Sequence, residues 1–182
     1  MCNLRWVASK DQEMVHLNIR KADPADAREL SEILNEIIAI GGTTAIETPL
    51  SPEELADWFI AGEWPLTCHV AESSSGLAGF QSLSLYGNPP KGWADIATFA
   101  RQNPKIPGVG TALFAATLAV AKERNIEFIN ATIRADNAGG LAYYEKMGFR
   151  TYNTIEKVPL KDGTLVDKIQ KQYEVQKGRS DL

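Results

Sequence analysis

Cysteine and histidine are scarce in this sequence, and their scarcity excludes several classes of protein. Only two of each occur, Cys2 and Cys68, and His16 and His69. Two cysteines cannot build the disulfide framework of a small secreted domain, so a reducing cytoplasm is the predicted location. Neither histidine has a ligand-type residue at helical or turn spacing, as a metal site would require. We therefore predict no metal site and assign both histidines structural or surface roles.

The chain also lacks a long apolar run and an excess of basic residues. No apolar stretch approaches the ~20 residues that span a bilayer, so no membrane protein is expected. Residues 1–15 are too polar for a secretory signal, so export is not expected either. The formal net charge is −4 at pH 7, whereas a nucleic-acid-binding surface would show a basic face. We predict no nucleic-acid partner.

The composition that remains is that of a globular protein. Apolar residues make up 44% and charged residues 23% of the 182 residues, which is typical of a folded chain with one domain. No repeat or low-complexity linker divides it. We predict an irregular extension over residues 1–15 and a single domain over residues 16–182.

Hydrophobic periodicity predicts a series of strands and helices. Leu30, Ile33 and Leu34 recur at helical spacing, and Asp23 followed by Pro24 marks the start of their helix. Ser51 with Glu54 forms a capping box at the start of the second helix. The predicted strands are 16–20, 66–72, 77–87, 93–100, 127–134, 149–160 and 165–175. The predicted helices are 23–42, 51–62, a helix from the glycines at 108 and 110 to about 124, and 137–147.

Gly108 and Gly110 stand where a predicted strand gives way directly to a helix. The first amides of a helix have no partner inside it and carry partial positive charge. A glycine there lets a phosphate approach the backbone closely, because no Cβ blocks it. A tight turn alone would also use two glycines, so this short pattern leaves both interpretations open.

Two common phosphate-binding motifs fit this stretch poorly. A P-loop needs Lys and then Ser or Thr after its last glycine, whereas Thr111 and Ala112 follow here. A dinucleotide-binding fingerprint needs a third small residue where this chain has Leu113. It also needs an acid at the end of the next strand, for which Asp136 comes late. A nucleotide-binding α/β domain is therefore the weaker alternative.

Two segments carry a resemblance to a known family. "KIPGVGTAL" resembles the Q/R-x-x-G-x-G/A motif with which the GCN5-related N-acetyltransferases grip the pyrophosphate of acetyl-CoA. "NAGGLAYYEKMGFRTY" resembles their other signature, in which an Asn opens a helix that closes in Y-E-K-x-G-F. The two occur in the family's order, and the likeness runs over about residues 17–175. "IETPLSPEELADWF" is similar to the branch with phosphinothricin and methionine sulfoximine acetyltransferases.

The resemblance implies an α/β fold with a mixed, mostly antiparallel sheet of six or seven strands. It also implies helices on both faces and a V-shaped splay between the central strands. Relatives in this branch are commonly homodimers, so we expect one here. The implied co-substrate is acetyl-CoA, with its pantetheine along residues 98–100 and its pyrophosphate at residues 105–111. The predicted cofactor-binding residues are Thr98, Phe99, Ala100, Lys105, Ile106, Pro107, Gly108, Val109, Gly110, Thr111 and Asn137.

Two positions depart from the family motif. Lys105 stands where the motif has Arg or Gln, and Pro107 has no N–H to offer a phosphate. Arg101 and Gln102 are the candidates for replacing the missing contacts. The departures also leave open a different class of function, a non-catalytic acyl-CoA-binding module.

The resemblance implies two catalytic residues. Tyr144 occupies the Y of "YEKMGF", where the family's tyrosine gives a proton to the coenzyme A sulfur, and a phenol with a pKa near 10 suits that role. Asp95 falls where phosphinothricin-type enzymes carry Glu as general base, and being shorter it would act directly or through water. The competing interpretations are an ordinary strand residue for Asp95 and a helix-face aromatic, like Tyr143, for Tyr144.

The sequence therefore predicts an acetyl-CoA-dependent N-acetyltransferase that acts on a small-molecule amine, an amino acid or an analogue of one. The second predicted helix carries two aromatic residues, Trp58 and Phe59, with Trp64 just beyond. All three are expected to pack this helix against the sheet.

Overall fold

A seven-stranded sheet forms the body of the protein, in the strand order β1-β2-β3-β4-β5-β7-β6. The structure is a computed structural model that describes residues 16–176, so the predicted extension over residues 1–15 lies outside the described residues. Neighbouring strands run antiparallel except β4 and β5. The strands are β1 (Asn18–Lys21), β2 (Pro65–Ser73), β3 (Gly76–Ser84), β4 (Trp93–Ala100), β5 (Phe128–Arg134), β6 (Arg150–Pro159) and β7 (Leu165–Glu174).

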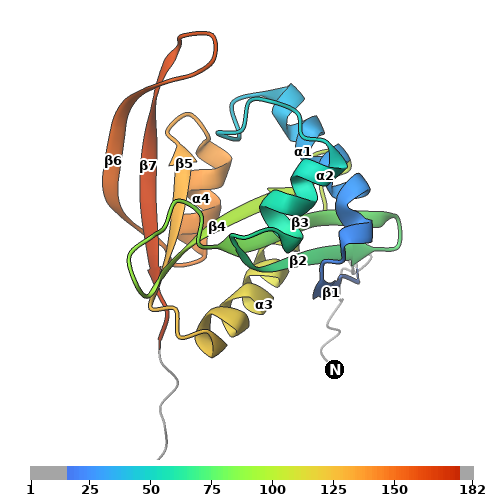
Figure 1. The fold of residues 1–182 in the computed structure, drawn as a ribbon. Helices are drawn as coiled ribbons and strands as arrows, with labels where there is room; N and C mark the ends of the chain where they lie inside the picture. Colours follow the sequence, from blue (N-terminus) through green and yellow to red (C-terminus); the bar gives the residue numbers. More distant parts are fainter. Residues whose placement is uncertain (1–15, 177–182) are drawn as a thin grey trace, which may run out of the picture.

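Helices cover both faces of the sheet (Figure 1). One face carries η1 (Pro24–Asp26), α1 (Ala27–Ile40), α2 (Pro52–Leu55) and η2 (Ala56–Ala61), and the other carries α3 (Val109–Glu123) and α4 (Ala138–Lys146). The predicted order of strands and helices and the predicted fold class are confirmed. Within the described range, none of these helices combines the length and the apolar character needed to cross a bilayer.

The face under α1 and α2 holds an aliphatic and aromatic core. Leu30, Ile33 and Leu34 are fully buried in one cluster with Val70 and Phe80 of the sheet. These are the positions that helical periodicity predicts, because residues three and four apart lie on one face of a helix. α1 is thereby fixed on this face of the sheet, over β3 and β4.

The second predicted helix, 51–62, begins as expected but changes its geometry. The Ser51 hydroxyl accepts from the Glu54 N–H at 3.1 Å and the Glu54 carboxylate accepts from the Ser51 N–H at 2.8 Å, which confirms the capping box. Residues 56–61 then form a π-helical turn. Phe59 is buried against Phe80 and Phe99, whereas Trp58 is 48% exposed. The prediction that Trp58 packs on the sheet is wrong, because consecutive residues of a helical turn point in different directions and Phe59 occupies the buried side.

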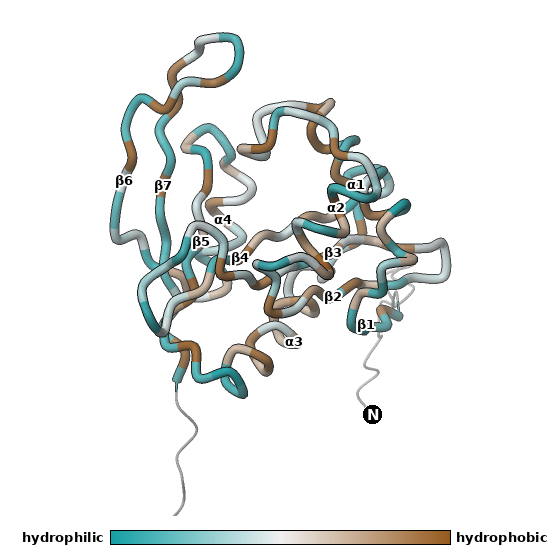
Figure 2. Tube along the Cα trace, in the orientation of Figure 1, coloured by the Kyte–Doolittle hydropathy of each residue, from teal (hydrophilic) through white to brown (hydrophobic). Residues whose placement is uncertain are grey.

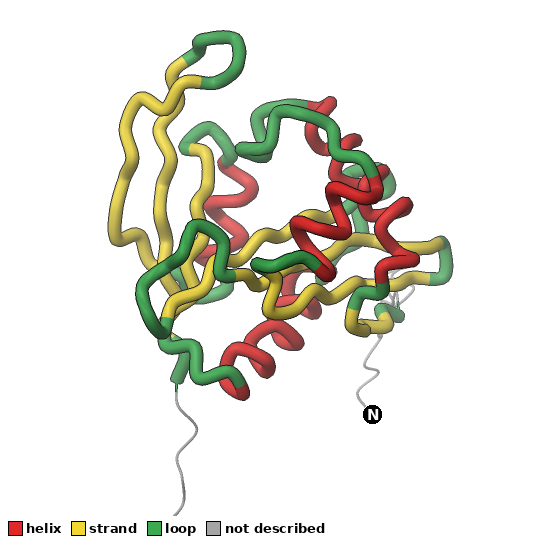
Figure 3. Tube along the Cα trace, in the orientation of Figure 1, coloured by secondary structure: helices red, strands yellow, loops and turns green. Residues whose placement is uncertain are grey.

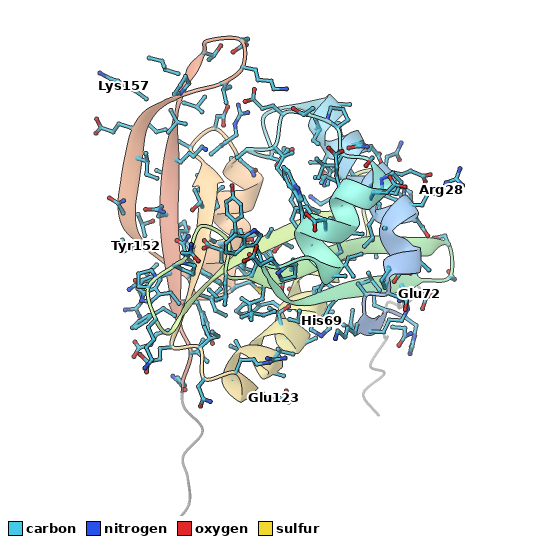
Figure 4. The ribbon with its side chains drawn as sticks, viewed as in Figure 1. Arg28, His69, Glu72, Glu123, Tyr152 and Lys157 are labelled. Atoms are coloured by element: carbon cyan, nitrogen blue, oxygen red, sulfur yellow. The ribbon has the colours of Figure 1, made fainter. Side chains whose placement is uncertain are left out.

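The opposite face packs against α3 and α4. Val109 and Leu113 of α3 lie on Ala71 and Ala78 of the sheet, and Phe114 joins a second cluster. His69 of β2, labelled in Figure 4, is buried, and this burial lowers its pKa so that the imidazole is neutral near pH 7. It lies away from the cleft described below, as a structural histidine would.

The two parallel strands part soon after they pair. β4 and β5 are hydrogen-bonded only where residues 93–95 lie beside residues 128–130. β4 then continues along β3 to Ala100, and β5 continues along β7 to Arg134, so the two strands diverge (Figure 1). The predicted V-shaped splay is confirmed, with Asp95 at its apex.

Beyond β5 the sheet continues as a projecting hairpin of β6 and β7. β6 is exposed along nearly its whole length and is mainly hydrophilic, as Figure 2 shows. Lys157, at a bulge with φ of 54°, lies on the outer part of the hairpin (Figure 4). Bulges and lysines on an edge strand hinder pairing with another sheet. The hairpin tip contacts the α1–α2 loop, where the Lys161 N–H donates to the Glu47 carboxylate at 3.1 and 3.2 Å.

The packing of α1 predicts different costs for one substitution at two positions of the same helix. Ile33→Ala removes a side chain that is 0% exposed, and Ile40→Ala removes one that is 58% exposed. We expect the first to lower the free energy of unfolding by about 2–5 kcal/mol and the second by less than about 0.5 kcal/mol. Urea unfolding monitored by circular dichroism measures both. Equal losses would contradict the assigned helix face.

Candidate active site

A cleft of about 720 Å³ enters the sheet where β4 and β5 part. Its walls come from the second half of β4, the segment 105–111, the start of α4, the end of β5 and the α1–α2 loop at 41–46. Every predicted cofactor-binding residue lines this cleft, and so does Tyr144. Asp95 does not line it, although the next two residues of β4 do. The fold thus gathers two sequence motifs at one opening.

The wall formed by β4 has an unpaired backbone edge. Ile96 to Ala100 remain in register with β3 on one side, but pairing with β5 has already ended at Asp95. Backbone N–H and C=O groups need partners, from either water or a ligand. This edge therefore suits an extended ligand that carries amide groups of its own.

Gly108 gives the cleft an open, positively polarised end. Its φ is +84°, a conformation that favours glycine, and no atom lies within 4 Å of the position that a Cβ would take. The first helical bond of α3 is the Ala112 N–H to the Gly108 carbonyl, at 2.9 Å. The amides of residues 109–111 precede it, so they are the unpaired donors of the helix start. Val109 is buried beneath the helix and has only its backbone to offer.

Position 110 requires a glycine for a different reason. A Cβ at this position would lie 2.6 Å from Cε2 of Tyr143, whose hydroxyl donates to the Gly110 carbonyl at 2.8 Å. The ring of Tyr143 thus occupies the space beside the glycine, and α4 packs tightly on the start of α3. The two glycines share a loop but not a role.

Gln102 and Arg101, the candidates for replacing the phosphate contacts that Lys105 and Pro107 do not provide, differ in whether they reach the cleft. Gln102 lines the cleft, and its amide donates to the Ala100 carbonyl at 2.7 Å. Arg101 instead donates to the Leu77 carbonyl at 3.1 Å and pairs with carboxylates of α1, so it does not line the cleft. Lys105 is exposed at the rim, and Lys146 and Arg134 also line the cleft.

Asn137 fastens the cleft wall. Its Oδ1 accepts from the Gly140 N–H at 2.8 Å, so Asn137 caps the start of α4. Its Nδ2 donates to the Thr43 carbonyl at 2.8 Å, and Arg134 donates to the Thr44 carbonyl at 3.5 Å. These bonds hold the α1–α2 loop across the end of the cleft, where Figure 3 shows the loop beside β5 and α4. Contact between Asn137 and a coenzyme stays a prediction.

Tyr144 presents a buried hydroxyl to the cleft. The side chain is 7% exposed, and its oxygen lies 3.0 Å from Oγ1 of Thr98. Burial raises its pKa well above the ordinary value of 10, and the bond with Thr98 offsets part of that rise. The phenol therefore keeps its proton at neutral pH and is competent as a donor.

Asp95 lies on the other face of β4. Side chains alternate along a strand, so Asp95 and Phe99 face α1 while Thr98 faces α4. The Asn130 amide donates to the Asp95 carboxylate at 2.5 Å, and the Tyr152 hydroxyl, labelled in Figure 4, donates to the Asn130 carbonyl oxygen at 2.9 Å. Burial raises the pKa of Asp95 above its ordinary 3.8, and the bond from Asn130 opposes that rise. A carboxyl group with a raised pKa thus stands at the apex.

Comparison with known proteins decides the family. The model of the Acetyltransferase (GNAT) family matches residues 31–149. The chain belongs to the GNAT family. With the family, the predicted class of enzyme, an acetyl-CoA-dependent N-acetyltransferase, is confirmed.

Individual relatives of this GNAT enzyme point to one branch. It is 27% identical over 154 residues to "Putative phosphinothricin acetyltransferase YwnH" of Bacillus subtilis (strain 168), across 83% of this chain and 94% of that protein. A crystal structure described as a "putative phosphinothricin N-acetyltransferase" matches at 27% identity with a TM-score of 0.77, over 89% of this chain and 100% of that one. The predicted branch is confirmed.

A further solved relative shares the fold. The acetyl-CoA complex of a GNAT superfamily phosphinothricin acetyltransferase from Sinorhizobium meliloti matches with a TM-score of 0.75 at 20% identity, over 91% of this chain and 92% of that one. Acetyl-CoA is thus present in the structure of one protein with this fold.

Several residues of the GNAT site escape sequence reasoning. Gln81 and Asn130 are polar residues inside apolar strands, which is a signal for a site, but neither belongs to a motif. Tyr152 and the loop 41–46 reach the site only through the tertiary fold. Within residues 16–176, no three His, Cys, Asp or Glu side chains gather as metal ligands would.

The contact between Gly110 and Tyr143 predicts a strong coupling. Gly110→Ala should destabilise this GNAT enzyme by about 1–3 kcal/mol, because the new methyl overlaps the ring. In a Tyr143→Ala background the same change should be neutral or stabilising, because alanine is the better helix former. Thermal and urea unfolding of the four proteins give the coupling free energy.

A second glycine serves as the control for this cycle. Gly139 lies in α4, and a Cβ there would meet its nearest atom at 3.8 Å. Gly139→Ala should therefore not destabilise the protein, with or without Tyr143. Additive effects of Gly110→Ala and Tyr143→Ala would contradict the packing described here.

Proposed function

We propose that this enzyme transfers the acetyl group of acetyl-CoA to the amine of a small molecule, an amino acid or an analogue of one. Tyr144 acts as general acid, and Asp95 acts as general base, directly or through water. The observation that carries the proposal is one cleft that joins the unpaired amides of α3 to the hydroxyl of Tyr144. Bound acetyl-CoA would supply an activated thioester whose leaving group is a thiolate.

The residues present fit a coenzyme with a diphosphate and two amides. The amides of residues 109–111 point from a helix start, where anions are stabilised by the dipole, and Gly108 leaves its approach open. Lys105 adds a cation at the rim. The free edge at residues 98–100 supplies backbone partners for the pantetheine amides. Pro107 contributes no N–H, so we assign the diphosphate to residues 108–111.

Tyr144 fits the role of general acid because of its place and its proton. It lines the cleft, and its burial keeps the phenol protonated. Proton donation to the departing sulfur prevents the release of a free thiolate. The neighbouring Tyr143 is unsuited to that role, because its proton is engaged by the Gly110 carbonyl.

Asp95 fits the role of general base because of its place at the apex. It faces away from Tyr144, so an amine that enters from the α1 side would meet the base while the sulfur meets the acid. Because burial raises the pKa of Asp95, the difference between this pKa and the pKa of an ammonium group becomes smaller, which favours proton transfer. Asn130 holds one carboxylate oxygen and leaves the other for the amine or for a water molecule.

A small acceptor is supported by the confinement of this side of the site. The loop 41–46 is tied to α4, and residues 47 and 48 contact the hairpin tip at Lys161. The names of YwnH and of the matched crystal structure refer to phosphinothricin, an amino-acid analogue. A homodimer remains a prediction from the resemblance, and a cytoplasmic location remains a prediction from the scarcity of cysteine. Light scattering coupled to size-exclusion chromatography tests the dimer.

Titration calorimetry and an amine panel test the proposed function. The protein should bind acetyl-CoA and release thiol with at least one amine from a panel of amino acids that includes phosphinothricin and methionine sulfoximine. Tyr144→Phe should lower kcat by about 10²-fold or more without weakening acetyl-CoA binding. Tyr86→Phe, at a side chain that is 70% exposed, is the control and should have no effect. Binding without transfer to any amine would favour the acyl-CoA-binding module instead.

The pH dependence of kcat/KM tests the base. Asp95 must be ionised to accept a proton, so activity should fall as the pH drops through its pKa. Burial places that pKa above 3.8, and the acidic limb should lie correspondingly higher. Asp95→Asn should lower kcat and abolish this limb, whereas Asp57→Asn on the exposed side of η2 should preserve it. An unchanged limb in Asp95→Asn would assign the base elsewhere.

A further inference from the structure

A continuous chain of hydrogen bonds leads from the first turn of α3 to Tyr144. Tyr143 Oη donates to the Gly110 carbonyl at 2.8 Å, and the Gln81 amide nitrogen lies 3.2 Å from Tyr143 Oη and 2.9 Å from Thr98 Oγ1. Thr98 Oγ1 lies 3.0 Å from Tyr144 Oη. Gln81 is 0% exposed, and the chain links both helices of this face to β3 and β4.

The carbonyl at the start of this chain fixes its direction. A carbonyl oxygen only accepts, so the single proton of Tyr143 is given to Gly110. Tyr143 Oη must then accept from Gln81, which turns the NH₂ group of Gln81 toward both Tyr143 and Thr98. The opposite amide orientation would bury an NH₂ group without an acceptor, at a higher cost than the single unpartnered Oε1.

The proton of Thr98 is the next one to place. Its oxygen accepts from Gln81 at 2.9 Å, which leaves its own hydroxyl proton for a second partner. The oxygen of Tyr144 is the acceptor that the described structure offers at hydrogen-bond distance. Donation from Thr98 to Tyr144 uses this proton and leaves the proton of Tyr144 free of this bond.

We infer that Gln81 and Thr98 are positioning residues that turn the Tyr144 hydroxyl so that its proton faces the cleft. This inference rests on the proposed role of Tyr144 as general acid. It gives a purpose to a fully buried glutamine that no motif explains, and it connects the acid to the loop that we assign to the diphosphate.

The arrangement also serves the reaction step itself. As the amine nitrogen forms its bond to the acetyl carbon and the C–S bond breaks, the electron pair goes to sulfur, and Tyr144 gives that sulfur its proton. The phenolate that remains accepts the hydrogen bond from Thr98, which needs no rearrangement. Asp95 or a water takes the proton that the amine loses, and solvent returns a proton to Tyr144 after the products leave.

Neutron diffraction from crystals of the protein exchanged into D₂O tests the direction of these hydrogen bonds and needs no amine substrate. We expect deuterium on Thr98 Oγ1 along the line to Tyr144 Oη, and the deuterium of Tyr144 directed into the cleft. Deuterium on Tyr144 pointing at Thr98 would overturn the inference. This result does not depend on whether Tyr144 acts in catalysis.

A set of threonine variants tests the effect on catalysis with acetyl-CoA and the best amine of the panel. Thr98→Val should lower kcat by about 10- to 100-fold with little change in the KM for acetyl-CoA, because a hydrogen bond to a developing charge is lost. Thr98→Ser, which retains a hydroxyl, should recover most of that loss. Thr117→Val, at another fully buried threonine on α3, is the matched control and should keep the wild-type kcat.

The Tyr144→Phe background separates a positioning role from a structural one. When the phenol is absent, Thr98→Val should not lower kcat any further. Gln81→Leu, which should lower kcat in the wild-type protein, should likewise have no effect on kcat in this background. Equal costs in both backgrounds would overturn the inference, because they would show that Thr98 acts independently of Tyr144. Full activity of Tyr144→Phe alone would instead refute the general acid and hence the proposed mechanism.

Discussion

The early end of pairing between β4 and β5 is the constraint on which the site depends. Once these strands separate beyond Asp95, β4 keeps its bonds to β3 but presents an unpaired edge to the gap. An unpaired edge inside a sheet is costly unless water or a ligand satisfies it. This unpaired edge lines the cleft, and the two sequence motifs lie at the same cleft. The alternation of side chains along β4 turns Asp95 to the face opposite the one on which Tyr144 of α4 lies.

Polar groups buried in the opposite face determine how the cleft is shaped. Tyr143 fills the space beside Gly110 and uses its proton on the helix start, so α4 and α3 are locked together. Gln81 and Thr98 then connect Tyr143 to Tyr144 by hydrogen bonds. Buried networks of this kind specify a single arrangement, because each missing partner leaves an unsatisfied group. The loop proposed to receive the coenzyme and the tyrosine proposed to protonate its sulfur are thereby joined by one hydrogen-bond network.

The sequence predicts those features that local chemistry governs. Helical periodicity identifies Leu30 and Ile33 as core. The resemblance of two segments to the family motifs supplies the predicted cofactor-binding residues, all of which line the cleft. Gln81 and Asn130 are not predictable in this way, because their partners come from distant segments through strand register and helix packing. Trp58 shows the converse limit, since the sequence does not indicate which of two adjacent aromatic residues, Trp58 or Phe59, faces the sheet.

The central claim is that the cleft between β4 and β5 receives acetyl-CoA with its diphosphate on the start of α3. A crystal structure of the protein with acetyl-CoA tests it most directly. The account predicts diphosphate oxygens within hydrogen-bond distance of the amides of residues 109–111, and the thioester sulfur beside the hydroxyl of Tyr144. A diphosphate bound elsewhere, or a sulfur beyond the reach of Tyr144, would contradict it.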